Sequence, residues 1–159
     1  MKTYPMFFNA GGLVAGTGFI ARVSIKGRCL VEETGENYIS FFGLNPAAVA
    51  SDGSDLDQAY RAFVDRIRLI VFDIADESKD FDDFARRVRE FVEEDADRRS
   101  EEEWTEAVHE VREGRLNLEG FEKRNADEEE IGVEVERVQR PEESLPSLNN
   151  SPEWPRMAA

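Results

Sequence analysis

The stretch SDLDQAYRAFVDRIRLIVFDI, residues 54–74, decides the fold class. Its apolar residues recur at intervals of three and four, which predicts an amphipathic helix that covers one face of a sheet. Ser54 has Asp57 three residues later, a spacing that lets the two side chains cap free backbone N–H groups and start the helix. The predicted apolar face consists of Leu56, Ala59, Tyr60, Phe63, Ile67, Ile70, Val71 and Ile74.

The residues before this helix predict an antiparallel sheet. Between residues 19 and 25 apolar and polar side chains alternate, as expected of a half-buried strand. Residues 27–28 offer a turn or a bulge, and residues 29–31 form a short apolar run. After the turn residues 34–37, the segment 38–42 is rich in aromatic and β-branched side chains, which favour strands. Three strands in a meander are therefore predicted.

The residues after the first helix predict two more helices and one strand. A second helix is expected from about Asp80, and a third from Ser100 to a stop at Gly114. Alternating valines and glutamates over residues 131–136 predict a strand at the sheet edge. The predicted fold class is α+β: an antiparallel β-meander packed by one helix, followed by a helical pair and an edge strand.

The chain is expected to form one domain with two loose ends. Residues 1–18 contain Pro5 and several glycines and are predicted to be a flexible entry segment. Residues 19–140 are predicted to form a single α+β domain. Residues 141–159 are rich in proline, serine and asparagine and are predicted to be a mobile tail.

The composition excludes some classes of protein. The 159 residues include 20 basic and 35 acidic side chains, a formal net charge of −15, and 29 of the acidic residues lie within residues 51–140. This surplus argues against nonspecific binding of DNA or RNA, which needs clustered cations. A magnitude of about 2 to 8 is enough to keep a small domain dissolved, so the excess points to a basic partner.

The cysteine count and the hydropathy of the chain indicate in which cellular compartment the protein resides. Cys29 is the single cysteine and His109 the single histidine, so neither an internal disulfide nor a four-ligand cysteine–histidine zinc site can form. No apolar run reaches the roughly 18 residues of a spanning helix. A cytoplasmic protein without a membrane partner is expected.

Residues that could carry catalysis have more ordinary interpretations. His109 lies among glutamates on a helix without an evident nucleophile, and Cys29 lies in an apolar strand. The glycine-rich residues 11–18 precede a strand, whereas a phosphate-binding loop must precede a helix. The aspartates near residue 55 lack the spacing of a calcium loop. A non-enzymatic protein without metal or cofactor is expected.

The acidic runs are the candidate partner-binding residues. Such runs are commonly solvated helix faces, but they can also attract a cationic protein and exclude wrong partners. Trp154, between Pro152 and Pro155, could anchor in a partner's groove or belong to an idle tail. The predicted partner-binding residues are Asp52, Asp55, Asp57, Glu101, Glu102, Glu103 and Trp154.

The segment from Gly43 to Ala59, which runs from the meander into the helix, resembles HicB-like antitoxins. In that family a strand ends in a proline and glycine turn, a serine or threonine caps the helix, and a Leu-x-x-Ala pair opens it. The resemblance extends over about residues 19–75. It implies a small sheet with a packed helix, and neutralisation of a small, basic, RNA-cleaving toxin within a toxin–antitoxin system. The matching residues are Pro46, Ala50, Gly53, Ser54, Leu56 and Ala59.

Three functional hypotheses follow. The first is a HicB-like acidic protein that binds and neutralises a basic protein. The second is an inhibitor, phage-encoded for example, that mimics nucleic acid and occupies a groove of a nuclease or defence complex. The third is a metal-dependent hydrolase with paired carboxylates. Direct nucleic-acid binding is not expected, while homo-oligomerisation and DNA-binding autoregulation are left open.

Overall fold

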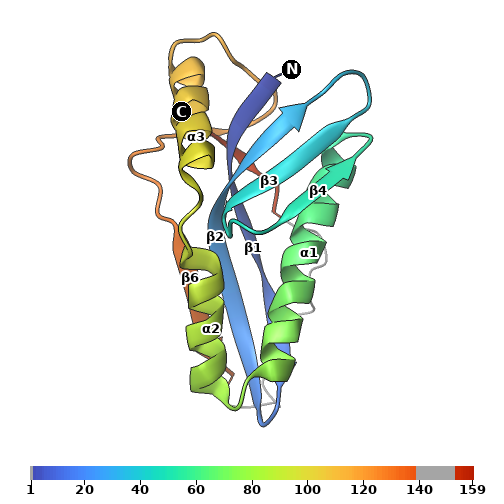
Figure 1. The fold of residues 1–159 in the computed structure, drawn as a ribbon, viewed down its shortest axis with the longest axis vertical. Helices are drawn as coiled ribbons and strands as arrows, with labels where there is room; N and C mark the ends of the chain where they lie inside the picture. Colours follow the sequence, from blue (N-terminus) through green and yellow to red (C-terminus); the bar gives the residue numbers. More distant parts are fainter. Residues whose placement is uncertain (1, 139–152) are drawn as a thin grey trace.

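A computed structural model describes residues 2–138 and 153–159 of the chain. Within these residues seven strands form one sheet, with helices on both of its faces (Figure 1). The hydrogen-bonded order is β4-β3-β2-β1-β7-β5, and β6 also pairs with β2. The elements are β1 (Lys2–Gly16), β2 (Phe19–Glu33), β3 (Ile39–Asn45), β4 (Ala50–Gly53), α1 (Leu56–Glu77), α2 (Phe81–Glu93), α3 (Arg98–Arg112), β5 (Lys123–Arg124), β6 (Gly132–Arg137) and β7 (Arg156–Ala158).

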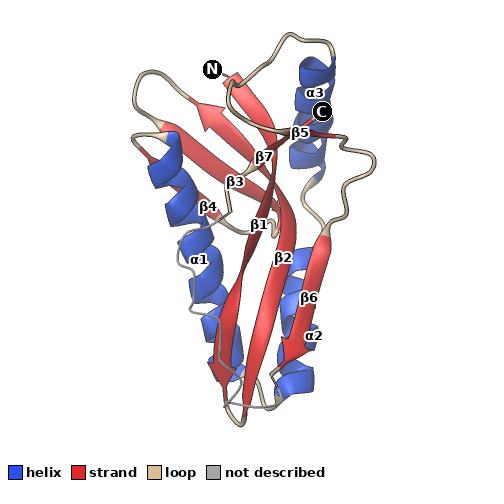
Figure 2. Cartoon of the chain, turned by 180° about the vertical axis from the view of Figure 1, so that it is seen from behind, coloured by secondary structure: helices blue, strands red, loops and turns tan. Residues whose placement is uncertain are grey.

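The long hairpin of β1 and β2 forms the centre of the sheet (Figure 2). Its pairing runs without interruption from Lys2 opposite Glu33 to Gly16 opposite Phe19. The predicted strands at residues 19–25 and 29–31 are one strand, with a bulge between Arg28 and Cys29 where the register against β3 shifts. The other edge of β2 is shared by β3 and β6, so β2 has neighbours along both edges.

The prediction of a flexible entry segment over residues 1–18 is wrong for residues 2–16, because these residues form β1. Tyr4, Met6 and Phe8 alternate into the main core and are almost inaccessible to solvent. Gly11 reflects close packing and not a loop, because a Cβ atom there would lie 2.5 Å from the backbone oxygen of Val23. A glycine inside a strand commonly marks such a close approach of two backbones. Gly18, at φ +78°, belongs to the turn that joins β1 to β2.

The helices bury the two faces of the sheet separately. On one face Phe63 of α1 packs edge-on against Phe8 of β1 and contacts the ring of Phe41 of β3. The core on this face also includes Val88 of α2. On the other face Trp104 of α3 packs edge-on against Phe7, with ring centroids 5.4 Å apart. The α+β class, the meander and its packed helix are confirmed, although α2 and α3 serve opposite faces.

The two ends of the described chain join the same sheet. β7 pairs with β1 at Met6 and Phe7, and Met157 is fully buried. The predicted mobile tail is therefore wrong for residues 153–159, because apolar side chains there complete the core; residues 141–152 lie outside the described part. The strand predicted over residues 131–136 is confirmed as β6, which pairs with β2.

Candidate interaction surface

The carboxylates predicted near the first helix have different environments. Asp55 is the N-cap of α1, and its Oδ1 accepts a hydrogen bond from the backbone N–H of Gln58 at 2.7 Å. Asp57 forms an ion pair with Arg61 one turn later. Asp52 lies on β4, where its Oδ2 accepts a hydrogen bond from the hydroxyl of Tyr38. Two of these three carboxylates thus serve the helix itself.

The three predicted glutamates of α3, Glu101, Glu102 and Glu103, are each ion-paired. Both carboxylate oxygens of Glu101 accept hydrogen bonds from Arg28 of β2, at 3.0 and 2.5 Å. The Arg28 side chain is only 17% exposed, and its guanidinium lies over the ring of Trp104. Glu102 and Glu103 pair with arginines one turn earlier on the exposed surface of the helix. Glu101 therefore fastens α3 to the sheet.

The sheet brings Asp52 and Glu103 to the same face. Directly opposed residues in antiparallel strands point to the same side, and Glu32, Ser40 and Asp52 are opposed across β2, β3 and β4. The neighbouring row on this side is Leu30, Phe42 and Ala50. Leu30 packs in the cluster of apolar residues beneath α3, so this is the face that carries α3. Asp55 and Asp57 belong to α1, which packs on the opposite face.

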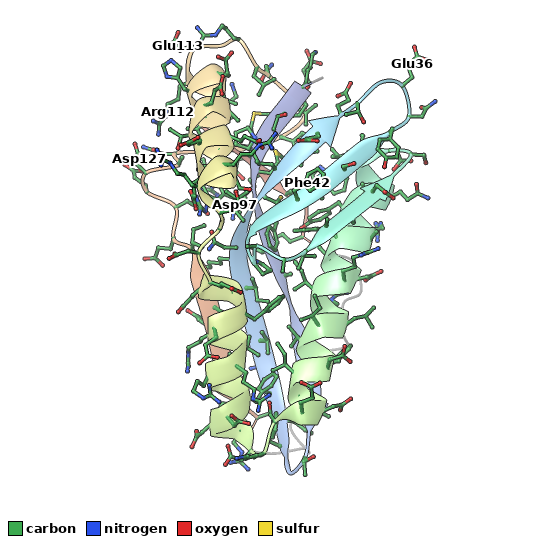
Figure 3. All side chains as sticks on the ribbon, viewed as in Figure 1. Glu36, Phe42, Asp97, Arg112, Glu113 and Asp127 are labelled. Atoms are coloured by element: carbon green, nitrogen blue, oxygen red, sulfur yellow. The ribbon has the colours of Figure 1, made fainter. Side chains whose placement is uncertain are left out.

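Phe42 is the residue that sequence reasoning missed. It is 41% exposed (Figure 3). Phe41 beside it is completely buried under α1. A pocket of about 210 Å³ separates Phe42 from the beginning of α3. Consecutive aromatic residues in a strand must face opposite sides, so the pair Phe41-Phe42 was a signal that one ring faces away from α1. We call the surface made by Glu32, Phe42, Asp52, Asp97 and Glu103 the Phe42 face.

Trp154 is held by contacts within the protein. Its ring stacks on Phe121 and meets Tyr60 edge-on, with centroid distances of 5.8 and 5.9 Å. The Tyr60 hydroxyl donates a hydrogen bond to the backbone carbonyl of Glu153, which fixes the chain beside the tryptophan. Burial is the main cause that raises the pKa of Tyr60. Trp154 remains partly exposed but is not a free anchor.

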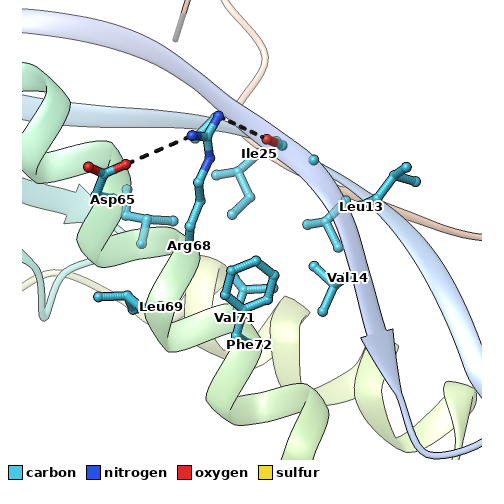
Figure 4. A pocket seen from close by; sticks show the side chains of 13 residues that line it. Leu13, Val14, Ile25, Asp65, Arg68, Leu69, Val71 and Phe72 are labelled. Atoms are coloured by element: carbon cyan, nitrogen blue, oxygen red, sulfur yellow. Dashed lines mark hydrogen bonds and ion pairs between the residues drawn. The ribbon is translucent and has the colours of Figure 1, made fainter. Parts of the chain in front are cut away.

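An apolar groove lies between β1 and α1 (Figure 4). Its volume is about 480 Å³, and Leu13, Val14 and Phe72 contribute to its lining. Arg68 crosses one end, where it donates a hydrogen bond to the backbone carbonyl of Gly11 at 3.4 Å. Leu69 on its α1 wall is strongly exposed. The groove contains few polar groups that could orient a reaction.

The remaining chemical groups are separated from one another. His109 is exposed on α3 and pairs with Glu113, and burial of the Cys29 thiol raises its pKa. The described residues contain no cluster of three or more histidine, cysteine or acidic side chains arranged to bind a metal ion. None of the described helices is both long and apolar enough to cross a membrane.

Comparisons with protein-family models, curated proteins and solved structures find no match to this chain.

Proposed function

We propose that the protein is a non-enzymatic, HicB-like acidic binding protein that neutralises a basic protein partner, such as a small RNA-cleaving toxin. The observation that carries the proposal is an exposed aromatic ring, Phe42, on a sheet face that also presents Glu32 and Asp52. Protein interfaces combine a buried aromatic anchor with a polar rim, and complementary charge selects the partner.

Carboxylates near the carboxyl end of α1 add support to the proposal of a cationic partner. Asp73, Asp76 and Glu77 lie near the carboxyl end of α1, and neither α1 nor α2 has a basic residue in its last turn. A negative charge there opposes the helix dipole, at a cost of about 0.3 to 1 kcal/mol when exposed. These side chains do not stabilise their own helix and instead add to the long-range negative field of the molecule.

The net negative charge of the protein is suited to fast and selective association with a cationic partner. A net charge of −15 creates a field that raises the encounter rate with a cationic protein and repels nucleic acid. The Phe42 ring would supply the short-range apolar contact that holds the partner once it has arrived. The two contributions respond differently to salt, since only the first is screened.

Native co-purification followed by mass spectrometry tests the proposal. The untagged full chain would be purified from its native source at about 50 mM and 500 mM salt, where the Debye length is about 14 and 4 Å. We expect a basic polypeptide to be retained at low salt and largely lost at high salt. Absence of any basic partner would contradict the proposal, and recovery of a large nuclease or defence complex would favour the nucleic-acid mimic.

A further inference from the structure

We propose that the pocket beside Phe42 receives an arginine side chain of the partner. This inference rests on the proposed function and specifies how the partner is recognised. The pocket measures about 210 Å³, below the roughly 300 to 1,000 Å³ of small-molecule sites, so it has room for a single long side chain. Its lining combines apolar surface with carboxylates, which is the combination that an arginine side chain requires.

The apolar part of the pocket matches the stem of an arginine. Leu30 and Leu44 form its buried floor, and Phe42 presents its exposed ring at the side. A guanidinium stacks on an aromatic face, and the methylene groups of the same side chain cover aliphatic surface. A lysine ammonium is more strongly hydrated and lacks the flat shape that stacks on a ring.

The charges around the pocket favour a cation. Its lining holds the carboxylates of Glu32, Asp97 and Glu103 and one guanidinium, that of Arg99, which pairs with Glu103. Asp97 is the N-cap of α3 and accepts a hydrogen bond from the backbone N–H of Ser100, so its charge is engaged at the helix end. Glu32 forms no ion pair with any described residue and is available to the partner.

The protein already contains one arginine held in this way. Arg28 lies on the same face, 5.2 Å from the centroid of the Trp104 ring, and donates two hydrogen bonds to Glu101. Phe42 and Glu32 likewise place an aromatic ring and a carboxylate in one pocket, whose single arginine, Arg99, is paired with Glu103. The geometry of Arg28 thus provides an internal example of the contact we infer for the partner.

Three labelled peptides of equal length test the inference. Each carries lysines at alternate positions, and the central residue is arginine, lysine or norleucine. Measured by fluorescence anisotropy with the full chain, the arginine peptide should bind about fivefold more tightly than the lysine peptide, although the two have the same charge. Phe42→Ala should remove this difference, and Glu32→Gln should reduce it.

Glu102→Gln is the matched control, because it removes the same charge from an ion-paired residue of α3 that does not line this pocket. It should keep the preference for arginine, and circular dichroism would verify that each variant is folded. Equal binding of the arginine and lysine peptides, a preference that survives Phe42→Ala, or a dimer of the chain that buries Phe42 would overturn the inference. Salt-sensitive retention of a basic protein alongside any of these results would leave the proposed function standing.

Discussion

At the scale of single residues, the direction of one side chain separates core from surface. Phe41 is completely buried between α1 and the sheet, whereas Phe42 is exposed on the face that carries α3. Both residues are phenylalanine and both lie in β3, so composition does not distinguish their roles. The alternation of strand side chains does, once the position of α1 is known.

Asp83 provides a prediction about pH. Its carboxylate accepts a hydrogen bond from the backbone N–H of Lys79 and another from Arg86, and these contacts lower its pKa to about 2. The ionised form is therefore favoured in the folded protein, so Asp83 contributes stability above about pH 4, and this contribution is lost as the pH falls toward 2. Carboxyl-carbon NMR should place its titration midpoint near pH 2.

Asp83→Asn should lower the urea concentration at the midpoint of unfolding at pH 7. The difference in this midpoint between the variant and the unmodified protein should shrink as the pH falls from 4 toward 2. A titration midpoint near pH 4, or a difference that does not depend on pH, would show that the hydrogen bonds to Asp83 do not persist in solution.

At the scale of elements, α3 is fixed to the sheet by a small cluster. Trp104 supplies the apolar contact, and the pair of Arg28 with Glu101 supplies the polar one. Because Arg28 is mostly shielded from water, this ion pair should contribute more than the exposed pairs of the same helix. The position of α3, and with it the shape of the Phe42 face, depends on these contacts.

Glu101→Gln should lower the free energy of unfolding by about 1 kcal/mol, since it leaves a neutral partner for the shielded guanidinium. Glu102→Gln, whose partner Arg98 is almost fully exposed, should change it by less than about 0.5 kcal/mol. Urea unfolding at neutral pH measures both. Equal effects of the two substitutions would mean that Arg28 and Glu101 do not fasten α3.

Alanine substitutions at two glycines of the sheet should have contrasting effects on stability. A Cβ atom at Gly27 would collide with the backbone oxygen of Asn45 and the ring of Phe8, whereas one at Gly132 would meet nothing within 4 Å. Gly27→Ala should lower the free energy of unfolding by about 1 to 3 kcal/mol, and Gly132→Ala should be tolerated. Thermal unfolding compares them, and similar melting temperatures would contradict the packing described around Gly27.

The helices were predicted from the sequence more accurately than their caps and the first strand. The spacing of apolar residues predicted all three helices, and Asp80 was correctly placed at the start of α2. The caps of α1 and α3 are Asp55 and Asp97 and not the predicted serines, because neighbouring polar residues compete for the same role. β1 was missed because its glycines are the signature of a loop as well as of closely packed strands.

The candidate site was predicted less completely than the fold. Asp52 and Glu103 do share one face, but Asp55, Asp57 and Glu101 serve the helices, and Trp154 packs on Tyr60. Acidic composition predicts a cationic partner, but it does not predict which carboxylates are free of contacts within the protein. That distinction depends on contacts between elements distant in sequence, such as Arg28 with Glu101.

At the scale of the whole molecule, the account depends on a surface that combines long-range charge with a short-range aromatic contact. The net charge of −15 acts over a Debye length, whereas Phe42 acts only on contact. The most direct measurement is the dissociation constant of the co-purified basic partner between about 50 and 500 mM salt. We predict a weakening of at least about tenfold, with a shallower salt dependence for Glu32→Gln combined with Asp52→Asn. A dissociation constant that stays the same across this range would contradict the account.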